Sequence, residues 1–299
     1  MFPSEILKGN GFLSNTISLY PSFLSQACNL LLNWSPRIRW SKKIHVPASW
    51  YELQRSNRYL LFFYWISGSW RGDRRTPRWL GNRFFEGNGV RLFLDPQPSN
   101  ESAVAEFVRH YPIRSLNVVA HIRKATQGAM GLENTHPFMR ELWGRYWIFA
   151  HNGNLIEYQP DLDGSYMPVG QTDSERAFCH LLQTLRRRFP AGPPDRFVLR
   201  DVLDDFARNV RFHGLFNFLL SNGDCLFAHR STDLYYIIRQ APFAVAHLKD
   251  EDVSVDFSEV TTPDDRVALV ATLPLTDNEV WTPLPVDHVV LFADGRVIS

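Results

Sequence analysis

The feature that most constrains this chain is a change of character after Arg83. The first 83 residues carry 12 Lys and Arg against 3 Asp and Glu, a net charge of +9, whereas the other 216 residues carry a net −8. Six of the nine tryptophans also lie before residue 84. Sustained alternation of apolar and polar residues begins only after Arg83. The chain therefore divides into a basic, Trp-rich segment, 1–83, and a patterned domain, 84–299.

The basic segment does not have the pattern of a nucleic-acid-binding arm. Its charges are interleaved with aromatic runs such as 60–65, at neither helical nor strand spacing. Nucleic-acid binding is thus the last-ranked alternative, and a steep fall of binding with salt would be its signature. No apolar run reaches about 18 residues, which excludes a membrane helix. Three scattered cysteines favour a reducing, cytoplasmic location.

After Arg83 the pattern predicts an α+β protein. A Gly-Asn-Gly turn at 87–89 predicts a hairpin over 84–93. Further strands are expected at 115–120, 143–150, 216–220, 226–229, 267–272 and 289–292, and helices at 174–187 and 196–210. Asp173 or Ser174 is expected near the N-cap of the first helix. Strands, a helix pair and more strands predict stacked sheets with helices outside them.

Four short segments concentrate the polar chemistry of the patterned region. They are His121–Gly128, Asn134–Phe138, Ala150–Leu155 and Thr172–Glu175. Each has a structural explanation when taken alone. Asn152-Gly153 is a common turn dipeptide, Arg123 at a strand end is usually a solvated charge, and Asp173 before a helix is usually a cap.

Together and in this order, the segments resemble the class II glutamine amidotransferases, the N-terminal-nucleophile (Ntn) type, and within them the stand-alone YafJ-like branch. The strings DPQPS (95–99), LENTHPFMRELWGR (132–145), AHNGNL (150–155) and TDSERAFC (172–179) carry the resemblance. It implies an Ntn-hydrolase-like four-layer αββα sandwich over residues 84–299. The first strands of that sandwich are expected to be missing or scrambled in this chain.

The resemblance also implies a reaction and its residues. An N-terminal cysteine attacks the γ-carboxamide of glutamine, and its own α-amino group serves as the base, since its pKa of about 7.7–8 is close to working pH. The Asn152 side chain and the Gly153 backbone N–H correspond to the oxyanion hole. Arg123, with Thr126 beside it, corresponds to the site for the substrate carboxylate, and Asp173 to that for its ammonium group.

The implied nucleophile does not stand at the start of the chain, which reads Met-Phe-Pro. Cys179 lies inside a predicted helix and Cys225 inside a predicted hairpin, so both are expected to be core residues. Cys28 lies in the basic segment, and cleavage before it would be needed to expose an amine.

Synonymous codons offer an explanation for the missing cysteine. Read one nucleotide downstream, the codons from His45 can encode MCQLLGM, and those of residues 73–83 can encode TGEHRDGWGIA. Tryptophan codons force glycine in this frame at Trp50, Trp65, Trp70 and Trp79. The family's amino-terminal pattern is of this kind, and one missing T at Arg83–Phe85 would join the frames. The hypothesis is that residues 1–83 are an out-of-frame translation; its alternative is a divergent amino terminus on a pseudoenzyme.

The expected function is an amidohydrolase that releases ammonia or an amine from glutamine or a γ-glutamyl compound. The ammonia passes to a separate synthase subunit, or the protein simply hydrolyses a γ-glutamyl compound. The alternative is a catalytically inactive γ-glutamyl-binding or interaction protein. No metal or other cofactor is expected, because the sequence has no Gly-rich phosphate loop and no ligand cluster.

Overall fold

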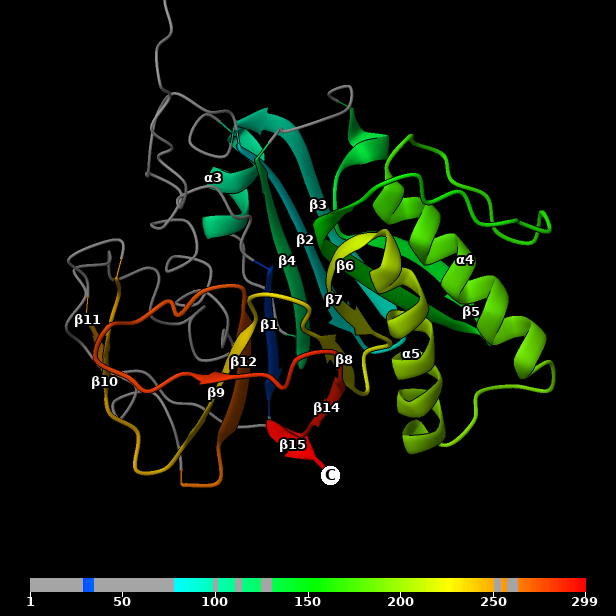
Figure 1. Ribbon diagram of the computed structural model, residues 1–299. Coiled ribbons are helices and arrows are strands. Elements are labelled where there is room, and N and C mark those ends of the chain that lie inside the picture. The colour runs from blue at the N-terminus through cyan, green and yellow to red at the C-terminus, as the bar shows by residue number, and fades with distance from the viewer. Residues whose placement is uncertain are drawn as a thin grey trace, which may run out of the picture.

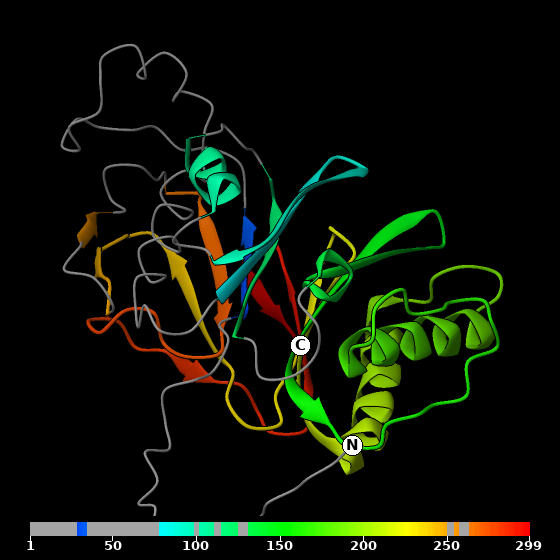
Figure 2. The ribbon, with the colours of Figure 1, turned by 90° about the horizontal axis from the view of Figure 1, so that it is seen from above.

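Two β-sheets packed face to face form the body of the protein (Figure 1). The computed structural model describes residues 29–34, 78–98, 102–110, 115–124, 131–249, 254–256 and 263–299. Seen from above, helices α4 and α5 lie on one side of a six-stranded sheet and the seven-stranded sheet lies on its other side (Figure 2). The architecture is α+β, as the sequence predicts.

The seven-stranded sheet is antiparallel throughout, in the order β13-β9-β12-β1-β4-β2-β3. Its strands are β1 (Asn29–Trp34), β2 (Arg78–Glu86), β3 (Gly89–Pro98), β4 (Asn117–Lys124), β9 (Tyr235–Gln240), β12 (Arg266–Ala271) and β13 (Thr282–Pro283). Helix α3 (Ala103–His110) packs against β3. The first strands were expected to be missing or scrambled; two stretches before residue 84, namely β1 and the first part of β2, do form strands of this sheet.

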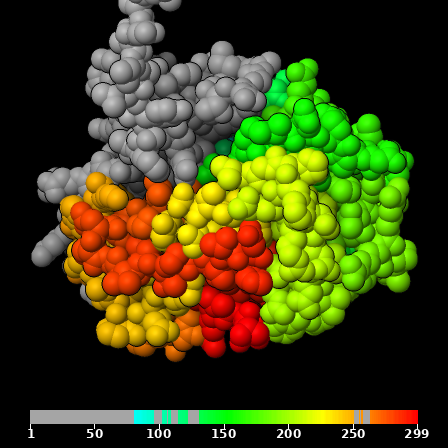
Figure 3. Space-filling model, in the orientation of Figure 1, coloured from blue at the N-terminus to red at the C-terminus, as the bar shows by residue number. Residues whose placement is uncertain are grey.

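The six-stranded sheet has the order β15-β14-β8-β7-β6-β5. Its strands are β5 (Phe138–Leu142), β6 (Arg145–Leu155), β7 (Gly214–Ser221), β8 (Leu226–His229), β14 (Val289–Ala293) and β15 (Arg296–Ile298). A separate ribbon pairs β10 (Val245–His247) with β11 (Ser254–Asp256), and two short 3-10 turns are η3 (Leu132–Asn134) and η4 (Arg211–His213). In Figure 3 the carboxyl-terminal residues, in red, lie at the surface between the orange and the yellow-green segments.

The two long helices are α4 (Asp173–Arg188) and α5 (Arg196–Val210). The N-cap of α4 is Thr172, which is extended (φ −79°, ψ 143°) and whose hydroxyl accepts the Glu175 N–H. Asp173 and Ser174, which were expected near the N-cap, are the first two residues of the helix. Asp195 caps α5 in the same manner through the Phe197 N–H.

Strand β6 separates two apolar layers by the alternation of its side chains. Phe149 packs against Phe178 of α4, with ring centroids 5.1 Å apart, in the layer between the six-stranded sheet and the helices. Ile148 and Ala150 point the other way and join Val270 of β12 between the two sheets. Because all four side chains on β6 and α4 are fully buried, this strand is fixed on both faces as it approaches its carboxyl end.

Among the described residues, no helix is both long and apolar enough to cross a membrane.

Candidate active site

Three strand ends of the seven-stranded sheet meet at one edge. Leu30 of β1 pairs with Ala120 of β4 on one side and with Ala271 of β12 on the other. Because β1 is antiparallel to both neighbours, the amino end of β1 lies beside the carboxyl ends of β4 and β12. At that end Asn29 pairs with His121.

The carboxyl end of β6 reaches the same edge from the other sheet. Asn152 donates its side-chain N–H to the hydroxyl of Thr272, the residue after β12, over 3.3 Å. Its backbone is fixed from β7, since the buried Asn217 amide donates to the Asn152 carbonyl over 3.0 Å. Asn217 in turn accepts the backbone N–H groups of Ser231 and Thr232. The half-buried Asn152 side chain therefore stands at a supported position between the sheets.

Gly153 is the next residue along, and its backbone is exposed. A Cβ atom there would lie 1.9 Å from the Leu215 carbonyl oxygen and 2.6 Å from Nε2 of His151. Both distances are far below a van der Waals contact, so β6 approaches β7 here in a way that only glycine permits.

Gly153→Ala is expected to destabilise the protein by about 3 kcal/mol, because the carbonyl it would meet belongs to a paired strand. Urea unfolding measures the loss. Gly89→Ala is the control: its Cβ would meet nothing closer than 3.4 Å, and a change within about 1 kcal/mol is expected. Equal losses for the two variants would show that the close approach does not matter.

Asp173 joins the end of β6 to the start of α4. One carboxylate oxygen accepts the Leu155 N–H over 2.7 Å, and the other accepts the Ser174 N–H over 2.8 Å. The first turn of a helix favours a negative charge, because its backbone N–H groups point toward it. The half-buried carboxylate is thus held two residues beyond Gly153 in the strand.

His151 ties the same parts together from the buried side, and the sequence analysis did not identify it. Its Nε2 lies 3.0 Å from the Leu215 carbonyl and its Nδ1 lies 2.8 Å from the Ser174 hydroxyl. Complete burial lowers the pKa of the ring, although the nearby Asp173 carboxylate acts in the opposite direction. The neutral ring therefore donates from Nε2 and accepts the Ser174 hydroxyl at Nδ1.

Acid is expected to destabilise the fold through its buried histidines. Burial lowers the pKa of both His151 and His229, so below pH about 6.5 the unfolded chain binds protons that the folded chain does not. The stability that the two neutral histidine rings contribute is therefore fully present above that pH. It is lost as the pH falls toward the lowered pKa values that the rings have in the folded state. Melting temperatures between pH about 7.5 and about 5.5 should show this loss. His288→Asn is the control, since that side chain is 62% exposed; a flat profile would contradict the expectation.

Of the other two predicted site residues, Arg123 and Thr126, the structure describes only the backbone of Arg123. Arg123 is the penultimate residue of β4, paired with Trp79, and thus lies at the same edge as Asn152. Its side chain, like the whole of Thr126, lies outside what the structure describes. The described residues therefore bring together Asn152, Gly153 and Asp173.

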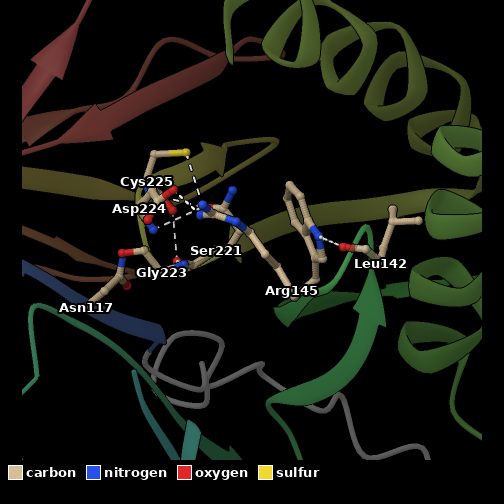
Figure 4. A network of polar contacts seen from close by, with 9 residues as sticks. Asn117, Leu142, Arg145, Ser221, Gly223, Asp224 and Cys225 are labelled. Atoms are coloured by element: carbon tan, nitrogen blue, oxygen red, sulfur yellow. Dashed lines mark hydrogen bonds and ion pairs between the residues drawn. The ribbon is translucent and has the colours of Figure 1, made fainter. Parts of the chain in front are cut away.

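The two described cysteines are core residues, as predicted, and both are free thiols. Burial raises the pKa of Cys179 on α4 to about 11 and that of Cys225 to about 12. Cys225 lies in the β7–β8 turn, where Ser221 donates to its carbonyl over 2.8 Å (Figure 4). A thiol with such a pKa is a poor nucleophile near neutral pH, and Cys28 lies outside the described residues.

Within the described ranges, no group of three or more His, Cys, Asp or Glu side chains could hold a metal ion.

Comparison with known proteins supplies the family. Residues 63–299 match the family described as glutamine amidotransferases class-II. YafJ of Escherichia coli K12, a candidate glutamine amidotransferase, is 50% identical over 216 residues, which cover 72% of this chain and 85% of YafJ. A crystal structure from Pseudomonas aeruginosa PA01, described as a predicted glutamine amidotransferase, is 40% identical with a TM-score of 0.66, covering 92% of this chain and 99% of that one.

A more distant structure supports the fold alone. The glutamine PRPP amidotransferase of B. subtilis is 15% identical with a TM-score of 0.51, and the alignment covers 91% of this chain and 48% of that one. The sandwich of two sheets with outer helices is therefore the Ntn-type fold of these enzymes. On its match over residues 63–299, this chain belongs to the class II glutamine amidotransferases.

Proposed function

We propose that the edge formed by β4, β6 and β12 is a site that releases ammonia or an amine from glutamine or a γ-glutamyl compound. The observation that carries the proposal is the placement of Asn152 and Gly153 beside the amino end of β1 and the start of α4. A side-chain amide N–H and the backbone N–H of an exposed glycine are donors of the kind that an oxyanion needs. A strand that begins at this edge would bring an amino-terminal nucleophile to them.

The reaction then proceeds through a thioester. The cysteine sulfur attacks the γ-carbonyl carbon, while its proton passes to the free α-amino group. The carbonyl oxygen becomes negative, and the Asn152 amide and the Gly153 N–H stabilise it. Collapse of this intermediate breaks the C–N bond, and the α-ammonium group protonates the departing ammonia. Water then attacks the thioester, which yields glutamate and the free thiol.

Charged groups at the same edge would select the substrate. Arg123 can hold the α-carboxylate by a bidentate pair, with Thr126 as a further donor. Asp173 would receive the α-ammonium group. Its two oxygens already accept backbone N–H groups, which fixes the carboxylate in place and leaves its charge for the substrate.

We propose residues 84–299 as the amidotransferase domain. In the present chain, β1 and the first part of β2 come from the basic segment 1–83 and complete the seven-stranded sheet of that domain. We favour direct hydrolysis of a γ-glutamyl compound over transfer of ammonia to a separate synthase subunit. The free thiols of Cys179 and Cys225 support a reducing compartment, the cytoplasm.

The test is incubation of the protein, expressed with an amino-terminal cysteine, with L-glutamine and with γ-glutamyl amides. Ammonia or amine and glutamate should appear in equal amounts. Hydroxylamine should intercept the thioester as γ-glutamyl hydroxamate. Failure to release ammonia from any γ-glutamyl amide, by a folded protein with a free amino-terminal thiol, would overturn the proposal.

A second candidate is binding without catalysis. It is favoured by one observation: both described cysteines are buried, with raised pKa values. Calorimetry distinguishes it, since the present chain would bind L-glutamine while releasing no ammonia. A confirmed amino terminus without cysteine, together with such binding, would establish this alternative.

A further inference from the structure

Two buried polar side chains in strand β2 are out of keeping with their surroundings. Asn82 is fully buried, and neither its amide nitrogen nor its amide oxygen has a hydrogen-bond partner in the described part of the chain. Arg83 is 5% exposed, and its Nε and one Nη likewise have no hydrogen-bond partner among the described residues. Buried polar groups in native proteins are nearly always paired. Two adjacent exceptions therefore require an explanation.

The neighbours of these side chains are apolar on both faces of the strand. Asn82 pairs with Ala120 of β4 and Phe93 of β3, and Arg83 pairs with Val119 and Leu92. Arg83 shares its face with Phe85 and Val119, which belong to the apolar layer between the sheets. This burial lowers the pKa of the Arg83 guanidinium to about 9, with desolvation as the cause.

The genetic code supplies apolar alternatives at both places. In the frame one nucleotide downstream, every synonymous choice for Asn82 followed by Arg83 reads as isoleucine or threonine in the first position. Every choice for Arg83 followed by Phe84 reads as alanine, valine, glycine or aspartate in the second. Isoleucine and threonine suit a buried strand, and the arginine cation is removed in every case.

Gly81 precedes these two residues in β2 and is itself closely packed. A Cβ atom at this position would lie 1.7 Å from the backbone oxygen of His136, so the strand requires glycine here. The downstream frame permits glycine at this position and permits Gly-Ile-Ala over residues 81–83. It is thus compatible with the glycine that the close approach to His136 requires, and it removes the two buried polar side chains at positions 82 and 83.

We propose that the functional protein reads the codons of residues 45–83 one nucleotide downstream, begins Met-Cys, and enters the present frame at Phe84. The inference deepens the proposed function, on which its catalytic part rests, because it supplies the amino-terminal cysteine. The start that these codons can encode, Met-Cys-Gln-Leu-Leu, places a polar residue and then leucines after the cysteine, in the same order as Asn29-Leu30-Leu31 at the start of β1. A strand of this pattern in the place of β1 would bring its cysteine to the edge that holds Asn152.

Sequencing and peptide mapping test the proposal together. Genomic DNA across the codons of residues 40–90 should contain one further T in the run at Arg83–Phe85. Tryptic digestion of the protein from its own cells should give a peptide that runs through the junction into Phe84-Phe85, with isoleucine or threonine at position 82 and no arginine at position 83. The present frame instead requires the peptide Trp79–Arg83, because trypsin cleaves after Arg78 and Arg83.

Detection of the Trp79–Arg83 peptide in the cellular protein would overturn the proposal, as would a mature chain that begins at Cys28. These outcomes are independent of the enzyme assay. A joined reading frame in a protein that leaves glutamine intact would retain the frame and reject the function. Ammonia release by a protein that contains the Trp79–Arg83 peptide would reject the proposed frame and retain the proposed function.

Discussion

Replacing Asn152 by alanine, in the protein read through the junction at Phe84, is expected to lower kcat for glutamine about 10²–10³-fold. The reason is that its amide N–H would stabilise an oxygen that becomes negative only during the reaction. The loss should therefore fall on kcat, with KM changed much less. Steady-state ammonia release over a range of glutamine concentrations separates the two constants.

Asn154→Ala is the matched control for this variant. Asn154 lies two residues further along β6, is exposed, and stands at the end of the same strand. Turnover close to that of the parent protein is expected. If Asn152→Ala and Asn154→Ala behave alike, the oxyanion role of Asn152 is wrong, whatever the fate of the family assignment.

Glu175→Ala is expected to cost about 3–5 kcal/mol of unfolding free energy, the largest loss of stability that we anticipate. The Glu175 side chain is 2% exposed and forms an ion pair with Arg140 of β5. It also accepts the backbone N–H groups of Val169 over 3.1 Å and Gly170 over 2.7 Å. Removal would leave one cation and two amides without their acceptor. Urea unfolding followed by tryptophan fluorescence measures the change.

A solvent-exposed ion pair provides the control for Glu175→Ala. Arg145 and Asp224 form a salt bridge beside the β7–β8 turn, with side chains 50% and 69% exposed (Figure 4). Asp224→Ala is expected to change the unfolding free energy by no more than about 1 kcal/mol. A loss at Asp224 comparable to that at Glu175 would contradict the explanation by burial.

Sequence periodicity was sufficient for the elements whose burial is regular. Helix α5 has the predicted bounds, and α4 extends one residue beyond its prediction at each end. The hairpin of β2 and β3 turns at 87–88, as the Gly-Asn-Gly motif indicates, because glycine adopts the positive φ of 58° found at Gly87. These elements depend on local spacing and turn chemistry, which a sequence displays directly.

Elements defined by distant partners could not be predicted in the same way. Strand β9 is half-buried along four successive residues, so it shows no alternation, and its place follows from pairing with β12 and β13. Likewise, the local sequence places Glu175 in the polar segment Thr172–Glu175 but does not predict that its side chain is buried. Its burial depends on Arg140, 35 residues away, and on a loop that turns back over the helix.

The candidate site was predictable in part for a related reason. Asn152, Gly153 and Asp173 lie within 21 residues of one another and within recognisable strings. Thr272 and Asn217, which hold Asn152 from two other strands, have no such context. Their contribution arises only when the sheets pack.

The hydrogen bond from Asn152 to Thr272 crosses from one sheet to the other. The distance between the two layers is therefore built into the geometry of the site, and Ile148 and Val270 in the layer between the sheets help to set it. A sequence can change its surface loops without altering this spacing, whereas a modest change of volume between the sheets would move the Asn152 amide away from the position that we propose for it in catalysis. Substitutions in the inter-sheet layer are therefore expected to act on the proposed reaction as well as on folding.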